Sequence, residues 1–204
     1  DFKRVGDGDA GPNTGGMGAY SPVPMVDDDV LGDVMDRFVD PTLARLRSLG
    51  IDYRGVLYAG LMMTAEGPRM LEYNVRFGDP ECQVVVPRFT SDLAELLAQA
   101  AAGRIVDEPT FSPDHTVTVV CAADGYPSSP RTGDAISGID EARSIEGVSV
   151  YCAGVAAGDD GGLVTAGGRV LNVCGRGSTL AEARARAYEG VARIGWFALA
   201  LADA

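Results

Sequence analysis

Residues 70 to 81 carry the side chains with the clearest chemistry, in the order Met-Leu-Glu-Tyr-Asn-Val-Arg-Phe-Gly-Asp-Pro-Glu. Their alternation of polar and apolar types predicts a strand with Glu72, Asn74 and Arg76 on one face. Such neighbours lie roughly 6.5 to 7 Å apart, so Glu72 and Asn74 could both offer oxygens to a small divalent cation. A guanidinium one step further suits phosphate or carboxylate oxygens. The order of groups indicates a site for Mg²⁺ with phosphate.

An ordinary antiparallel strand with one face in solvent alternates in the same way, and this alternative stays open. Two neighbouring features favour function. The strand runs into the turn at residues 78–81, which adds the carboxylates of Asp79 and Glu81. It is also the second arm of an expected hairpin, since residues 56–64 form an apolar arm and residues 65–68 have turn chemistry.

A glycine-rich stretch, residues 6–18, is the second informative segment. Glycine lets backbone N–H groups approach an anion and adopt positive φ, so such a loop can cradle a phosphate or close over a ligand. The stretch matches neither a Walker loop nor a dinucleotide fingerprint, because no Gly-Lys-Ser/Thr follows and no strand-loop-helix frame surrounds it. A flexible surface loop is the open alternative.

Composition limits the classes of protein. Of the 204 residues, 46% are hydrophobic, which fits a folded chain, and the net charge of −12 argues against nucleic acid or an anionic membrane as partner. No apolar run approaches the roughly 20 residues of a membrane span. The four cysteines lack Cys-x-x-Cys spacing, which favours free thiols in a reducing cytoplasm. The sequence has a single histidine, His115, at the start of an expected strand. Because Ser-His-Asp and Cys-His sites need a histidine beside the nucleophile and zinc sites usually need several His or Cys ligands, these mechanisms are disfavoured.

The elements predict an α+β fold. In the first half we expect a helical region over residues 27–49, kinked at Pro41 and ended by Gly50, then the hairpin, then a helix capped by Ser91 over residues 92–102. Two prolines near residues 104–113 suggest a boundary, giving domains 1–107 and 108–204. The second half predicts strands and a closing helix, over residues 115–123, 148–156, 163–165, 169–174 and 179–194.

Several motifs resemble one enzyme family in the same order along essentially the whole chain. The chain is similar to phosphoribosylamine-glycine ligases, also called glycinamide ribonucleotide synthetases, of the ATP-grasp superfamily. The motifs are Lys3-Arg4-Val5-Gly6-Asp7, Gly11 to Pro22, Leu57-Tyr58-Ala59-Gly60-Leu61-Met62, Arg76-Phe77-Gly78-Asp79-Pro80-Glu81-Cys82-Gln83, Tyr126-Pro127 and Arg131-Thr132-Gly133-Asp134.

The resemblance implies a cytoplasmic enzyme of purine biosynthesis that joins glycine to 5-phosphoribosylamine through glycyl phosphate, cleaving ATP to ADP and phosphate. Glu72 and Asn74 would bind Mg²⁺ or Mn²⁺. Arg76 would stabilise the transferring phosphoryl group or the acyl phosphate, and Asp79 would help to hold glycine or the attacking amine. The substrate wall would come from Asn13, Thr14, Gly15, Gly16, Met17 and Gly18.

The resemblance also implies that the chain is one lobe of an ATP-grasp core, an antiparallel sheet with helices, followed by a small α+β C-terminal domain. The N-terminal half of the polypeptide would then supply most nucleotide contacts, and we expect residues 1–204 alone to be inactive. Two alternatives remain: a different ATP-grasp carboxylate-amine ligase or carboxylase that shares the Glu-x-Asn-x-Arg strand, and a non-catalytic module that keeps only the fold.

Overall fold

The computed structural model describes residues 1–196, which pack into two compact units. Each unit combines stretches that are distant in sequence, so the packing does not follow a single break after residue 107. The expected division into family domains 1–107 and 108–204 stays a prediction, and residues 197–204 lie outside the described part. Unit 1 comprises residues 1–21, 79–88 and 112–196, and unit 2 comprises residues 22–78 and 89–111.

Unit 1 is built on a five-stranded sheet in the order β1-β2-β5-β9-β6. Every neighbouring pair of its strands is antiparallel, which confirms the expected α+β class. The helical elements of the unit are α3 Cys82–Val85, η2 Val86–Arg88, α5 Ile139–Arg143 and α6 Leu180–Val191. The strands are β1 Phe2–Gly6, β2 Ala10–Ser21, β5 His115–Ala122, β6 Val148–Cys152 and β9 Arg169–Gly177.

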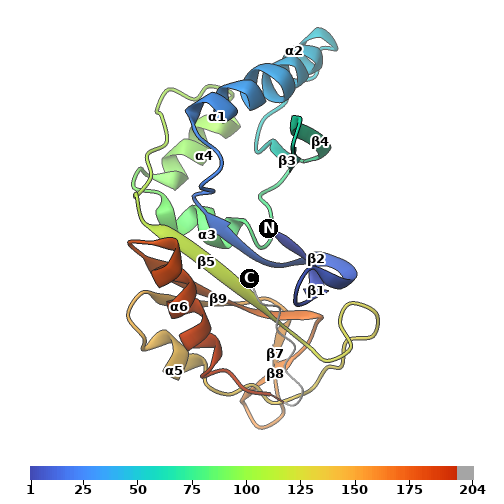
Figure 1. The fold of residues 1–204 in the computed structure, drawn as a ribbon, viewed down its shortest axis with the longest axis vertical. Helices are drawn as coiled ribbons and strands as arrows, with labels where there is room; N and C mark the ends of the chain where they lie inside the picture. The colour runs from blue at the N-terminus through green and yellow to red at the C-terminus, as the bar shows by residue number, and fades with distance from the viewer. Residues whose placement is uncertain (197–204) are drawn as a thin grey trace. The chain divides into compact units, whose positions relative to one another are not determined.

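Helix α6 packs along β5 and β9 and closes the main core (Figure 1). Thr179 begins the helix, because its hydroxyl accepts the Glu182 N–H at 3.1 Å, as the capping pattern predicts. The small residue Gly175 on β9 permits the close approach, since a Cβ there would lie 2.2 Å from the Ala183 carbonyl oxygen. Fifteen buried residues, among them Val119, form this core.

Most of the glycine-rich stretch is a strand, which corrects the expectation of a loop, and only residues 7–9 form a turn. Residues 10–21 form β2, paired with β1 and β5. Glycine is depleted in strands, so the sequence argued against one here. The pairing with β1 is irregular, and Gly16 has a φ of +118°, which a side chain rarely adopts.

A small hairpin extends from the sheet of unit 1. The expected strand over residues 148–156 is divided into β6 and β7 Val155–Ala157, and β7 pairs with β8 Leu163–Thr165. The division follows the change of partner, because β6 pairs with β9.

Unit 2 begins with a continuous helical run. It consists of α1 Asp28–Val34, the π-helical turn η1 Met35–Val39 and α2 Asp40–Ser48. Asp27 caps the run by accepting the Val30 N–H at 2.9 Å. Pro41 does not break the helix. It lies in the first turn of α2, directly after the π turn, where its missing N–H costs little.

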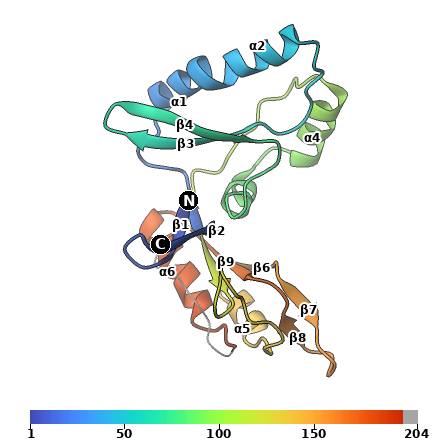
Figure 2. The same cartoon turned by 90° about the vertical axis from the view of Figure 1, so that its right-hand side faces the viewer.

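The expected hairpin is confirmed as β3 Tyr58–Thr64 and β4 Gly67–Asn74. The helical run lies along it in Figure 2. The Tyr73 hydroxyl donates to the Phe38 carbonyl oxygen at 2.7 Å and accepts from the Thr42 hydroxyl at 2.8 Å. These bonds fix β4 against the helices, although Leu71 and Val75 remain 63% and 72% exposed.

The last helix of unit 2 is α4 Leu93–Ala102. Its N-cap is Asp92, which accepts the Glu95 N–H at 3.1 Å, so the prediction of Ser91 was one residue early. Gly103 ends the helix in the left-handed region, as expected.

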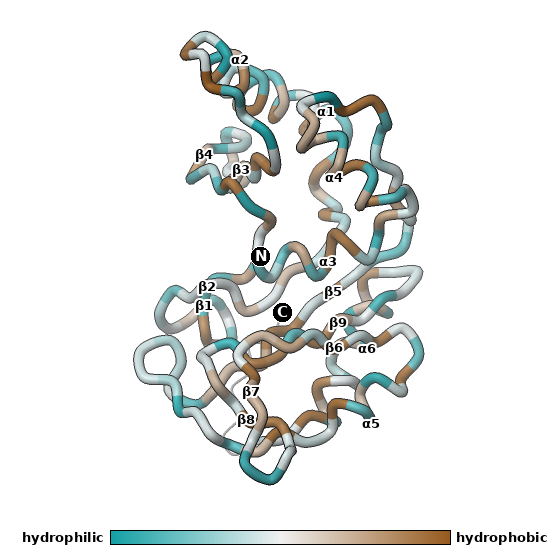
Figure 3. Tube along the Cα trace, turned by 180° about the vertical axis from the view of Figure 1, so that it is seen from behind, coloured by the Kyte–Doolittle hydropathy of each residue, from teal (hydrophilic) through white to brown (hydrophobic). Residues whose placement is uncertain are grey.

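The helices α1, α2 and α4 each carry both polar and apolar residues (Figure 3). No helix within residues 1–196 is long and apolar enough to cross a membrane.

Candidate functional site

Glu72 and Asn74 lie side by side on β4, as their spacing predicts. The Asn74 amide nitrogen donates to the Glu72 Oε1 atom at 3.1 Å. Gly60 is opposite Glu72 on β3, and a Cβ there would lie 3.2 Å from the Glu72 Cγ atom. The glycine therefore leaves room for the Glu72 side chain where it leaves the strand. Glu72 is exposed and Asn74 half-buried, so both can be reached from solvent.

The side-chain oxygens of Glu72 and Asn74 are suitable ligands for a hard divalent cation. A carboxylate and an amide supply oxygen ligands, which Mg²⁺ prefers, and Mg²⁺ commonly takes its other ligands from water and substrate phosphates. Within residues 1–196, no three His, Cys, Asp or Glu side chains gather into a group that could hold a metal ion.

Arg76 lies beyond the strand, which corrects its expected place on the strand face. β4 ends at Asn74, and residues 75 and 76 form a bend. The Arg76 guanidinium is exposed, and its Nη1 atom donates to the Phe77 carbonyl oxygen at 2.7 Å. A single neutral acceptor leaves most of its donors available to an anion.

Asp79 belongs to unit 1 and is held by two other elements of that unit. Its Oδ1 atom accepts from the Gln83 amide at 2.9 Å, and its Oδ2 atom accepts from Arg169 Nη2 at 3.1 Å. An ionised carboxylate has about four acceptor positions, so these two bonds leave positions unused. The side chain is 46% exposed and can still accept from a cationic group.

The backbone at Gly15 and Gly16 is fixed by the same arginine. Arg169 Nη1 donates to the Gly15 carbonyl oxygen at 3.1 Å, to that of Gly16 at 3.4 Å and to that of Asp79 at 2.8 Å. The Gly15 N–H donates to the Tyr126 hydroxyl at 3.1 Å. The strand and the turn at Asp79 are therefore joined through one guanidinium.

The other predicted substrate-wall residues differ in access. Asn13 is exposed, and Thr14 donates its hydroxyl to the Lys3 carbonyl oxygen at 2.9 Å. Met17 is fully buried and packs with Ala122, and Gly18 is also buried. Contact of a substrate with this stretch stays a prediction, and residues 13–15 are the accessible part of it.

The predicted site residues thus form two groups, one in each unit, and each is described by itself. Glu72, Asn74 and Arg76 belong to unit 2, whereas Asp79 and residues 13–18 belong to unit 1. Sequence reasoning missed Arg169 as a member of the second group. No local signal marks it, because its partners lie far away in sequence. Tyr126 stood in a recognised motif, but its bond to Gly15 could not be inferred.

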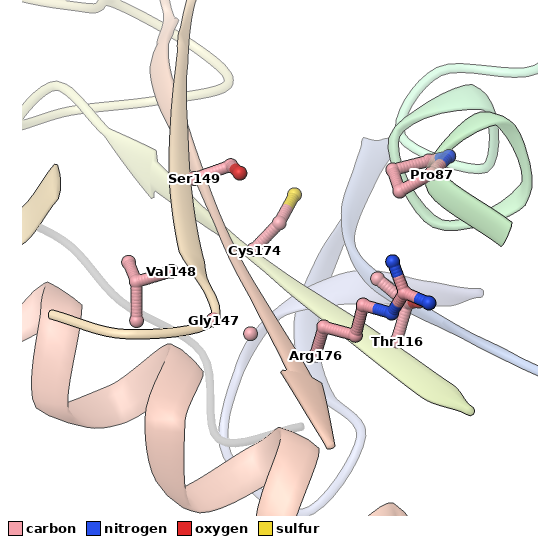
Figure 4. Close-up of a pocket in the computed structure, with 8 residues that line it drawn as sticks. Pro87, Thr116, Gly147, Val148, Ser149, Cys174 and Arg176 are labelled. Carbon is pink, nitrogen blue, oxygen red and sulfur yellow. The ribbon is translucent and has the colours of Figure 1, made fainter. Parts of the chain in front are cut away.

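A separate pocket of about 280 Å³ lies in unit 1 over the paired strands β6 and β9, and Pro87 and Thr116 also line it (Figure 4). Arg176 at its edge is paired with Asp114 at 2.7 Å, and this hydrogen-bonded partner lowers the pKa of Asp114. Burial raises the pKa of Cys174 to about 12, so its thiol is protonated at neutral pH and is a poor nucleophile. The pocket therefore offers neither an activated nucleophile nor an unpaired cation.

Comparison with known proteins concerns the family and the fold of the chain. Residues 1–82 match the family model of the phosphoribosylglycinamide synthetase ATP-grasp (A) domain, and residues 116–200 match the model of the phosphoribosylglycinamide synthetase C domain. The N5-carboxyaminoimidazole ribonucleotide synthetase structure from Thermotoga maritima has a TM-score of 0.60 at 14% identity, over 87% of this chain and 45% of that one. That likeness concerns the fold alone. The fold is that of an ATP-grasp protein.

Closer relatives define the family within that class. The crystal structure of phosphoribosylamine–glycine ligase from Thermotoga maritima has a TM-score of 0.86 at 40% identity, over 99% of this chain and 49% of that one. The chain belongs to the phosphoribosylglycinamide synthetase family.

Curated relatives carry the same name. The phosphoribosylamine–glycine ligase of Streptomyces coelicolor is 50% identical over 199 residues, which cover 96% of this chain and 48% of that protein. The phosphoribosylamine–glycine ligase of Brucella melitensis is 46% identical over 198 residues, which cover 96% of this chain and 46% of that protein. The chain spans about half the length of these curated relatives.

Proposed function

We propose that this chain is the C-terminal half of a ligase that joins glycine to 5-phosphoribosylamine at the expense of ATP, in purine biosynthesis. The observation that carries the proposal is the Glu72–Asn74 pair on β4. It lies in a chain that shares 50% sequence identity with an enzyme named phosphoribosylamine–glycine ligase. The partner implied is the N-terminal half that the relatives possess, with ATP, glycine and the amine as substrates.

In the proposed reaction a carboxylate oxygen of glycine attacks the γ-phosphorus of ATP, and ADP leaves. The amine nitrogen of 5-phosphoribosylamine then attacks the carbonyl carbon of glycyl phosphate, loses a proton and expels phosphate. The products are ADP, phosphate and glycinamide ribonucleotide. Since this chemistry consists mainly of positioning groups and neutralising charge, it needs cationic and hydrogen-bonding side chains rather than a protein nucleophile.

The first role falls to Glu72 and Asn74, which would hold Mg²⁺ or Mn²⁺ through their side-chain oxygens. A bound divalent ion neutralises the developing negative charge on the phosphates. The observation that supports these ligands is the hydrogen bond between the two side chains, because it places both on one side of the strand.

Arg76 and Asp79 would bind substrate groups of opposite charge. The exposed Arg76 guanidinium would bind the transferring phosphoryl group, where negative charge develops. The Asp79 carboxylate would hold the amino group of glycine or of the attacking amine, using the acceptor positions that Arg169 and Gln83 leave open. The accessible backbone of residues 13–15 would line the same substrate.

We place the activity in the cytoplasm. The four cysteines are free thiols, and Cys152 is exposed, which suits a reducing compartment.

The experiment is a product assay on a chain extended upstream to the length of its relatives. Equal release of ADP, phosphate and glycinamide ribonucleotide, dependent on glycine, the amine and a divalent cation, is the expected result. ATP cleavage that ignores glycine, or no cleavage by a folded protein, would reject the proposal. Mn²⁺ in place of Mg²⁺ identifies which ion supports turnover.

A further inference from the structure

We propose that Arg169 is a positioning residue for the amine-binding side of the site: it fixes the Asp79 carboxylate and the Gly15–Gly16 backbone relative to one another. The inference rests on the proposed function and adds a residue that neither the sequence motifs nor the relatives' names assign. Its basis is the set of bonds that one guanidinium makes to two segments distant in sequence.

The contacts of Arg169 divide between its two terminal nitrogens. Nη2 binds the Asp79 side chain at 3.1 Å, whereas Nη1 reaches the carbonyl oxygens of Asp79, Gly15 and Gly16 at 2.8, 3.1 and 3.4 Å. Hydrogen bonds to a charged group are stronger than neutral ones. The Arg169 side chain is only 23% exposed, so solvent competes weakly for these acceptors.

The glycines on the other side of the contact explain why the guanidinium fits. A Cβ at Gly15 would lie 3.1 Å from the Arg169 Cζ atom, and a Cβ at Gly16 would lie 2.5 Å from the Pro80 Cδ atom. Side chains at these positions would therefore displace the guanidinium or the Asp79–Pro80 turn. The Tyr126 hydroxyl supports the same backbone by accepting the Gly15 N–H.

The consequence concerns substrate affinity. Asp79 keeps about two of its four acceptor positions after binding Arg169 and Gln83, and the planar guanidinium determines which two. Without Arg169 the carboxylate loses its fixed orientation, and the carbonyl oxygens of the adjoining backbone lose their shared donor. We expect the loss to appear as weaker binding of an amino-group substrate rather than of ATP.

The test compares Arg169→Ala with Arg176→Ala in the extended chain. Arg176 is a matched control, because it lies at the other end of β9 and also pairs with one aspartate, Asp114. For Arg169→Ala we expect the KM for glycine or for 5-phosphoribosylamine to rise on the order of tenfold or more, with the KM for ATP changed less than about twofold. Arg169→Lys should recover part of the loss, because it keeps the charge but not the planar fork.

A second measurement does not depend on catalysis. Amide hydrogen exchange at residues 13–18 should become faster in Arg169→Ala and stay unchanged in Arg176→Ala. Unchanged exchange, unchanged amine and glycine KM values in an active enzyme, or equal effects of both substitutions would overturn the inference. An unmodified protein without glycine-dependent ATP cleavage would instead overturn the proposed function, and this role in catalysis with it.

Discussion

The amide nitrogen of Asn74 donates to the Glu72 carboxylate at 3.1 Å, across one intervening residue of β4. This contact brings together two side chains with oxygen ligands at a place where Gly60 on the paired strand leaves space.

Replacing Glu72 by glutamine should remove the charged metal ligand and keep the size of the side chain. In the extended chain we expect kcat to fall by roughly two orders of magnitude or more, because charge neutralisation at the phosphates is lost. Steady-state kinetics at limiting Mg²⁺ measure this. Glu66→Gln is the matched control, since Glu66 lies at the turn of the same hairpin and pairs with Arg69. Equal turnover of the two variants would exclude Glu72 as a ligand.

Arg76→Lys tests whether the guanidinium, rather than positive charge alone, is needed. The substitution keeps the charge and loses the planar fork, so we expect a large fall in kcat, about 10-fold or more, with the thermal stability unchanged. Arg69→Lys on the same hairpin should have no kinetic effect. If Arg76→Lys also leaves kcat unchanged, the bond from Arg76 to the Phe77 carbonyl oxygen is its whole role.

Gly16→Ala tests the close approach of β2 to the Asp79–Pro80 turn. The new methyl group would lie 2.5 Å from Pro80 Cδ, at a φ of +118°. We expect the free energy of unfolding to fall by roughly 2 kcal/mol or more, because steric overlap adds to backbone strain. Urea denaturation gives the value.

Gly8→Ala provides the control for that experiment. Gly8 also has a positive φ, of +65°, but apart from Gly8 and its chain neighbours no residue has a heavy atom within 4 Å of the position that a Cβ would take there. Its substitution should cost only the backbone strain, about 1 to 2 kcal/mol. Similar losses for both variants would mean that Gly16 is required for its conformation and not for the contact with Pro80.

The Arg176–Asp114 pair makes stability depend on pH. Its hydrogen bonds lower the pKa of Asp114 in the folded state below the ordinary value of about 3.9. The pair therefore stabilises the protein above that value, and its contribution is lost as the pH falls through the folded-state pKa. The Tm of the unmodified chain should exceed that of Asp114→Asn at pH 6, and the difference should shrink below about pH 4. A difference that is constant with pH would contradict this assignment.

The sequence predicted the elements whose signals are local. Alternation located the β3–β4 hairpin, and the spacing of Thr179 and Glu182 located the start of α6. The glycine-rich stretch was misread because its glycines serve contacts with residues far along the chain. Gly16 makes room for Pro80, and Gly15 makes room for Arg169. These glycines are therefore explained by close contacts made by the strand β2 and not by the flexibility of a loop.

The same difference between local signals and contacts made by distant residues applies to the candidate site. Glu72 and Asn74 could be paired from their spacing, since strand geometry fixes same-face neighbours. Arg76 was placed on that strand because alternation continues past Asn74, where hydrogen bonding to β3 has already ended. Arg169 could not be found, because its link to Asp79 depends on how the sheet of unit 1 brings residues 90 positions apart into contact.

The central claim, that these residues belong to a ligase that activates a carboxylate as an acyl phosphate, is tested most directly by isotope transfer. The extended chain would be given glycine labelled with ¹⁸O in its carboxylate, together with ATP, Mg²⁺ and 5-phosphoribosylamine, and the released phosphate would be analysed by mass spectrometry. The account predicts one ¹⁸O atom in each phosphate formed, because the bridging oxygen comes from glycine. Phosphate free of ¹⁸O, released alongside glycinamide ribonucleotide, would contradict it.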